Sequence, residues 1–139
     1  MAIRRSLALA LVAIAWAGVP GSAQGAATTV RLGIVHVVHG CHIWSSTKKP
    51  AATVKVPLGG RLVIRPDCPM DFEFHQVAGP KLRLGDPLTH AGTTRTIVFK
   101  KAGTYKLVAH NVQQPEDVGL QTLGVNDTLR LTIVVAARS

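Results

Sequence analysis

The chain has 139 residues, 47% of them hydrophobic and 17% charged, and a formal net charge of +9 at neutral pH. This length suits one small domain with a modest core. Only 4% of the residues are aromatic and they do not alternate with basic ones, which argues against a nucleic-acid-binding protein.

Residues 1–26 have the three parts of a secretory signal peptide. Arg4 and Arg5 form a basic start, an uncharged apolar run extends from Leu7 to Val19, and small residues follow Pro20. The apolar run has 13 residues, fewer than the ~20 of a membrane-spanning helix. We therefore expect a cleaved signal, a chain exported to the periplasm or out of the cell, and no transmembrane segment after cleavage.

The mature chain stays basic, because cleavage removes two arginines and no acid and the charge falls from +9 to +7 (9 − 2). Such a charge suits an anionic partner such as phospholipid head groups or cell-wall polymers. The basic residues are dispersed, so the same charge also fits simple solubility.

Seven short segments after the signal alternate apolar and polar residues with a period of two. They are 30–38, 53–56, 61–65, 72–77, 94–99, 104–109 and 129–135. Seven strands separated by turns, with no helical pattern, predict an all-β sandwich of two sheets over residues 28–137. The Pro- and Gly-containing turn at 57–60 predicts that the segments flanking it pair as a hairpin. Residues 111–126 show no strand pattern and predict a long loop.

The segment from Phe99 to Leu107 resembles a hairpin of the cupredoxin family, in which a Phe, a turn and Gly-Thr-Tyr-x-Phe precede the copper-binding loop. The strand 62–64 after a Gly-rich turn and the final strand 129–135 are similar as well, so the resemblance covers roughly residues 50–135. It implies a cupredoxin-like Greek-key β-sandwich of about seven strands.

The resemblance does not extend to the copper ligands of that family. A type 1 copper site needs two histidines, a thiolate and a weak axial ligand. Ala109 stands at the cysteine position and Leu120 at the axial position, and Phe72 or, with a shift, His75 stands at the position of the first histidine. If Phe72 and Phe74 face the core, alternation turns His75 outward. We therefore predict a divergent member without a blue, electron-transferring copper site.

Other candidate metal ligands lie in three segments. The first segment follows the predicted strand 30–38, the second follows the predicted strand 61–65, and the third lies at the start of the long loop. Under the topology that the resemblance implies, these three segments lie at the same pole of the sandwich. Thiolate and thioether ligands select Cu(I), and imidazole suits either copper state. The predicted copper ligands are Cys41, His42, Cys68, Met70, His39 and His110.

Cys41 and Cys68 have a second interpretation, because they are the only two cysteines in the chain. Small exported domains often carry a disulfide. A bond between Cys41 and Cys68 would close a loop of ~28 residues and stabilise the folded domain by roughly 3–4 kcal/mol. The alternative function is then a metal-free, disulfide-stabilised exported domain. It would bind a protein or cell-envelope partner through its basic surface and the 111–126 loop.

Other residues of this group also have structural interpretations. On a strand, His42 and Trp44 share a face, and Trp44 either caps the core or shields His42 or a bound cation. Met70 fits a gap in a core as well as it fits a metal site. No Gly-x-Ser-x-Gly, His-Glu-x-x-His or paired-carboxylate pattern is present, so we expect no enzyme.

Overall fold

The computed structural model of the chain describes residues 27–37, 41–112 and 128–137. The predicted signal peptide and most of the predicted 111–126 loop lie outside these residues. The described part has no helix that is long and apolar enough to cross a membrane. Its strands are β1 (Thr29–Val37), β2 (Cys41–Trp44), β3 (Ala51–Pro57), β4 (Arg61–Pro66), β5 (Asp71–Ala78), β6 (Leu88–Thr89), β7 (Arg95–Val98), β8 (Gly103–Val112) and β9 (Thr128–Ala136).

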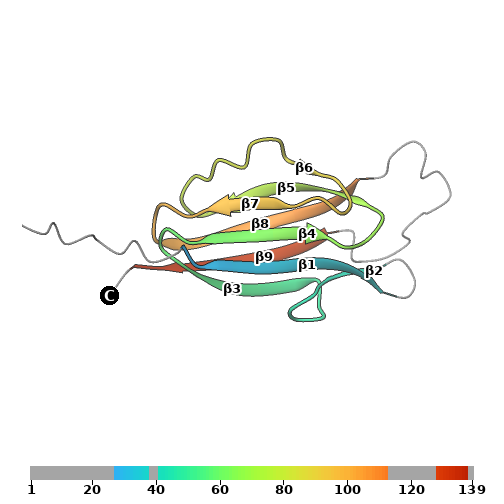
Figure 1. Cartoon of the computed structure of the whole chain (residues 1–139), viewed down its shortest axis with the longest axis horizontal. Helices are drawn as coiled ribbons and strands as arrows, with labels where there is room; N and C mark the ends of the chain where they lie inside the picture. The colour runs from blue at the N-terminus through green and yellow to red at the C-terminus, as the bar shows by residue number, and fades with distance from the viewer. Residues whose placement is uncertain (1–26, 38–40, 113–127, 138–139) are drawn as a thin grey trace, which may run out of the picture.

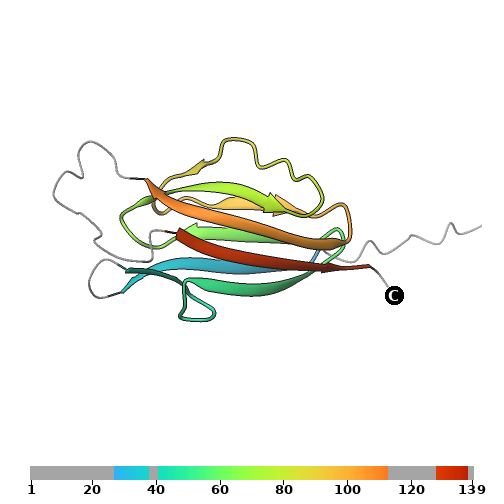
Figure 2. The same cartoon turned by 180° about the vertical axis from the view of Figure 1, so that it is seen from behind.

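The strands form two sheets that pack face to face, so the predicted all-β sandwich is confirmed (Figure 1). The four-stranded sheet has the order β2-β1-β4-β7, and the five-stranded sheet has the order β3-β9-β8-β5-β6. β1 pairs in parallel with β4, and β3 pairs in parallel with β9. The remaining pairs are antiparallel. Figure 2, the view from behind, brings β8 and β9 of the five-stranded sheet to the front.

The turn at 57–60 does not close a hairpin, so that prediction is wrong. β3 lies in the five-stranded sheet and β4 in the four-stranded sheet, and the turn carries the chain between them. Gly59 N donates to Phe99 O at 2.8 Å and Phe99 N donates to Gly60 O at 3.1 Å, which ties the turn to the end of β7. The connection from β7 to β8 also changes sheets, so the cupredoxin-like segment from Phe99 to Leu107 is not a paired hairpin.

The core lies between the sheets and takes alternate residues from the long strands. β8 buries Tyr105, Leu107 and Ala109, and its neighbour β9 buries Leu129, Leu131, Ile133 and Val135 on the same face of the sheet. Trp44 is fully buried in the same core, and its indole Nε1 donates to the carbonyl oxygen of Arg130 at 2.9 Å. Trp44 therefore packs as a core residue with its one polar atom satisfied, which is the usual state of a buried tryptophan.

Arg95 on β7 holds the long connection between β5 and β7 against the sandwich. Its guanidinium donates to Thr89 Oγ1 at 2.6 Å, to Leu84 O at 2.7 Å and to Leu88 O at 2.9 Å, and also to Asp86 O. The guanidinium carbon lies 5.2 Å from the centre of the Phe74 ring. Burial lowers the pKa of Arg95, and the nearby Asp86 charge opposes this shift. One side chain thus satisfies several backbone carbonyls of residues 84–88.

One end of the sandwich gathers the segments that carry the predicted ligands. β1, β4 and β8 end there, and β2, β5 and β9 begin there, as the strand registers require. It lies on the right in Figure 1. The turn with Cys68 and Met70 joins β4 to β5 at this end, which we call the Cys68 end. The prediction that the three segments share one pole is confirmed.

Candidate functional site

His42, on β2, is fully buried at the Cys68 end. It stands opposite His36 in the β1–β2 register, with their ring centres 5.5 Å apart. The His42 ring also makes an edge-to-face contact with the ring of Phe72. The two ring centres lie 5.2 Å apart, and the ring planes make an angle of 83°. Phe72 holds the position where the cupredoxin resemblance places the first copper histidine. An imidazole is therefore present beside that position, although it comes from another strand.

Cys68 is 7% exposed, and its thiol forms no disulfide within the described residues. Burial raises the pKa of this thiol above its ordinary value, against the lowering effect of a backbone hydrogen bond at Met70, and the Asp67 charge adds to the rise. A buried thiol with a raised pKa stays protonated and is a poor nucleophile. Cys41 begins β2, but its side chain lies outside the described residues, so the Cys41–Cys68 disulfide stays a prediction.

Met70 is 5% exposed and packs into the core cluster. Asn111 Nδ2 donates to Met70 Sδ at 3.1 Å. Asn111 lies on β8 opposite Phe72 on β5, so the antiparallel register brings its amide to the thioether. Met70 thus fills a core gap, as its structural interpretation predicted, and its sulfur also accepts a polar contact.

His110 lies apart from this buried group. It is exposed on the outer face of the five-stranded sheet, because the residue before it, Ala109, takes the inward position on β8. Its ring centre is 6.0 Å from that of His75, and its Nδ1 is 3.1 Å from Thr128 Oγ1. The structure therefore buries His42, Cys68 and Met70 at the Cys68 end and places His110 on the outer face of the five-stranded sheet. His39 and the Cys41 side chain lie outside the described residues.

Core side chains fill two of the positions that the cupredoxin resemblance gives to copper ligands. Phe72 and Ala109 are both buried between the sheets, as predicted, and Leu120 lies outside the described residues. His75 points outward with Glu73, also as predicted, and its Nε2 lies 3.2 Å from Glu73 Oε1. Within the ranges that the structure describes, no group of three His, Cys, Asp or Glu side chains is arranged to hold a metal ion.

Two polar residues at this end were missed from the sequence. Asn111, which contacts Met70, was assigned to the long loop, although it belongs to β8. Asp71 begins β5, and its carboxylate accepts from Ala91 N at 2.8 Å and lies 2.8 Å from His90 Nδ1. It thereby ties the β6–β7 connection to the Cys68 end. Its place directly after Met70, at the start of a strand, is the signal that could have revealed it.

Comparison with known proteins gives structural likeness and no sequence match. No protein-family profile matches the chain, and no curated protein sequence does. A reduced amicyanin mutant is 20% identical, with 82% of this chain and 88% of that chain covered and a TM-score of 0.45.

Two multicopper oxidases are also similar. For the one from Campylobacter jejuni the identity is 18% and the TM-score 0.45, with 80% of this chain covered. For the one from Pseudomonas thermotolerans the identity is 14% and the TM-score 0.48, with 81% covered. The chain spans 26% and 31% of the length of those two oxidases. At these identities and TM-scores the likeness to copper proteins says nothing of the family of this chain or of metal binding.

Proposed function

We propose that this chain is an exported binding protein that holds Cu(I) at the Cys68 end, and that it is not an enzyme. The observation that carries the proposal is the burial of an imidazole, a thiol and a thioether at one end of a cupredoxin-like sandwich. These come from His42, Cys68 and Met70. Thiolate and thioether are the ligands that select Cu(I), and imidazole completes such a set.

The imidazole, thiol and thioether of His42, Cys68 and Met70 are donor types that bind copper. Among the described side chains, however, they include only one nitrogen ligand and one thiolate ligand. Within the described part, no group of three His, Cys, Asp or Glu is arranged for a metal, and we propose the Met70 sulfur as a ligand beside His42 and Cys68. The Cys41 thiol at the start of β2 and His39 are the further donors we propose. Cys68 would lose its proton on binding, so the affinity for Cu(I) should increase with pH.

The test is an anaerobic titration of the reduced mature protein with Cu(I) against a chromophoric Cu(I) chelator. We expect one tightly held Cu(I) per chain, and Met70→Leu should weaken it by about tenfold or more because a ligand is lost. Leucine has nearly the volume of methionine, so the variant should fold.

His75→Gln and His110→Gln are the matched controls, because both histidines are exposed on the outer face of the five-stranded sheet. Neither should change the Cu(I) affinity. If His110→Gln weakens copper as much as Met70→Leu, or if the wild-type protein retains no Cu(I), the proposed site is wrong.

Export is the second part of the proposal and has its own test. The basic start, the short apolar run and the small residues before position 28 support cleavage of residues 1–26. N-terminal sequencing of the exported protein should find a first residue between Gly25 and Thr29. An intact Met1 in a membrane fraction would contradict a cleaved, exported chain.

A further inference from the structure

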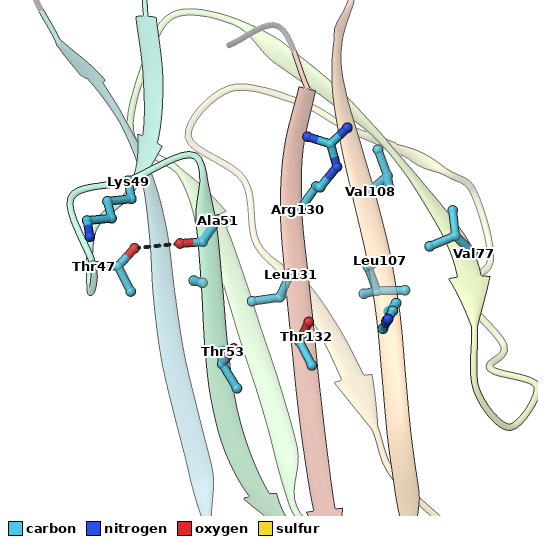
Figure 3. A pocket seen from close by; sticks show the side chains of 12 residues that line it. Thr47, Lys49, Ala51, Thr53, Val77, Leu107, Val108, Arg130, Leu131 and Thr132 are labelled. Atoms are coloured by element: carbon cyan, nitrogen blue, oxygen red, sulfur yellow. Dashed lines mark hydrogen bonds between the residues drawn. The ribbon is translucent and has the colours of Figure 1, made fainter.

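A shallow groove of about 840 Å³ crosses the outer face of the five-stranded sheet (Figure 3). It runs over β3, β9 and β8 to Val77 on β5, and the turn between β2 and β3 closes its other side. Three cationic side chains line it, and none of its lining residues is acidic. The cations are Lys49, Lys106 and Arg130.

Arg130 and Lys106 stand at diagonal positions of neighbouring strands. In the β8–β9 register Arg130 lies opposite Val108, and Lys106 lies opposite Thr132. Arg130, Thr132 and Lys106 therefore occupy adjacent positions on one sheet face, with the diagonal pair about 7–8 Å apart at the backbone. A guanidinium, a hydroxyl and an ammonium group at this spacing can surround one oxyanion. Arginine and lysine are the usual partners of phosphate oxygens.

The groove cations have no ion pair with any carboxylate in the described residues. Asp67 pairs with Arg65 at 2.9 Å, Glu73 lies by His75 at 3.2 Å, and Asp71 lies by His90 at 2.8 Å. Among the described residues, no carboxylate therefore neutralises the positive charge of the groove. Its positive potential also raises the local concentration of anions and speeds their approach.

The backbone under Arg130 is fixed, which limits the entropy lost on binding. Arg130 N donates to Pro50 O at 2.8 Å, and Arg130 O accepts from the indole of the fully buried Trp44 at 2.9 Å. β9 is also paired on both sides, with β3 and β8. The small side chain of Ala51 leaves room beside Arg130 in the register of β3 with β9.

We infer that this groove binds the phosphate group of an anionic ligand, with Arg130, Lys106 and Thr132 around the phosphate and Lys49 as a second cationic contact on the opposite wall. The groove lies on the outer face of the sheet and uses none of the proposed copper ligands. The inference therefore does not rest on the copper proposal.

Two probes test the inference and identify the source of the phosphate. Pyrophosphate is titrated into the mature protein at low salt by calorimetry, and vesicles of phosphatidylglycerol or of phosphatidylcholine are tested by co-sedimentation. Arg130→Gln and Lys106→Gln should each weaken pyrophosphate binding by about tenfold or more, since each removes charge-assisted hydrogen bonds. Lys55→Gln, an exposed lysine on β3 outside the groove lining, is the control and should change binding little.

The outcomes separate a free phosphate from a lipid headgroup. Pyrophosphate binding that depends on Arg130 supports a soluble phosphorylated ligand. Binding only to phosphatidylglycerol vesicles, with the same dependence, supports a phosphate on a lipid. If wild-type protein binds neither probe at millimolar phosphate, or if Lys55→Gln weakens binding as much as Arg130→Gln, the inference is overturned, because net charge alone then explains the binding. Unchanged Cu(I) affinity in Arg130→Gln keeps this result apart from the copper proposal.

Discussion

His42 and Phe72 meet from the two different sheets, and their contact shapes the chemistry of the Cys68 end. Phe72 lies on β5 and fills the place that the cupredoxin resemblance gives to a copper histidine. His42, on β2, brings its ring to within 5.2 Å of that phenyl ring. Ala109 removes the thiolate that β8 would otherwise supply. The sulfur ligands available to a metal at this end therefore come from the chain around Cys41, Cys68 and Met70.

Ala109 makes a spectroscopic prediction possible. Cu(II) added to the protein should give no intense absorption near ~600 nm, because the copper–thiolate unit of a blue site needs a cysteine where Ala109 stands. The measurement is a visible absorption titration of the mature protein with Cu(II). A strong blue band would contradict the prediction, and Cys41→Ser and Cys68→Ser would then show which thiolate reaches the copper.

Cys68 should react slowly with alkylating reagents in the folded protein. Burial raises the pKa of its thiol, and only the thiolate is the nucleophile. The reduced Cys41→Ser variant isolates Cys68, and its alkylation at pH 8 should be about tenfold slower or more in buffer than in urea. The rate in buffer should increase with pH. Equal rates in buffer and in urea would mean that Cys68 is exposed.

The same shift has a defined effect on folding. The unfolded thiol ionises at a lower pH than the buried one, so the contribution of Cys68 to stability is fully present below the ordinary thiol pKa. It decreases as the pH rises from that value through the raised pKa of the folded state.

The strands were predictable from local pattern where they are long, and not where they are short. All seven alternating segments correspond to strands, because burial on one face imposes a period of two. β2 and β6 have four and two residues and are too short for alternation to identify them. The prediction of a hairpin at 57–60 was wrong because turn residues determine only that the chain reverses. β3 joins its sheet by pairing with β9, and β4 joins the other sheet by pairing with β1, and both partners are distant in the sequence.

The candidate site was predictable in its position and only partly in its members. The shared pole was predicted from the topology that the cupredoxin resemblance implies, and the ends of the described strands confirm it. His110 was grouped with His42 because both adjoin that pole, but strand alternation on β8 turns Ala109 inward and His110 outward. Asn111 reaches Met70 only through the pairing of β8 with β5. Such a contact between residues 41 positions apart in the chain leaves no local signal.

Arg95 should matter more to the β5–β7 connection than any other basic residue near it. Arg95→Lys keeps the charge but loses the planar fork that reaches Thr89 and the carbonyls of 84–88. We expect a loss of about 1–3 kcal/mol in urea unfolding and faster hydrogen exchange in residues 84–89. Arg83→Lys, an exposed position in the same connection, is the control. Equal stability of the two variants would show that the Arg95 hydrogen bonds do not hold this segment.

The two proposed sites lie in separate parts of the molecule. The first is the group of buried donors at the Cys68 end, and the second is the basic groove on the outer face of the five-stranded sheet. The copper proposal and the disulfide alternative exclude each other only at the Cys68 end. They predict different effects on the stability of the domain. A bound ligand stabilises the folded state by an amount that increases with the logarithm of its concentration, while a disulfide stabilises it without any ligand. Thermal unfolding of the complete mature chain can therefore separate them.

If the Cys68 end binds Cu(I), the metal should raise the unfolding temperature of reduced protein. At a hundredfold excess over the dissociation constant the gain is roughly 2.7 kcal/mol. Cys41→Ser and Met70→Leu should each shrink this gain while changing the metal-free stability little, since leucine preserves the core volume around position 70.

If instead Cys41 and Cys68 form a disulfide, the pattern reverses. Reduction should then cost about 3–4 kcal/mol in the absence of metal, and Cys41→Ser and Cys68→Ser should each cause a similar loss. Met70→Leu should have almost no effect beyond the lost Asn111 contact. Melting of fully reduced protein that does not respond to Cu(I), in the wild type and in His42→Ala alike, would end the copper hypothesis. A reduced protein that melts like the oxidised one, and melts higher with Cu(I), would end the disulfide alternative, because one pair of sulfurs cannot be both cross-linked and bound to the metal.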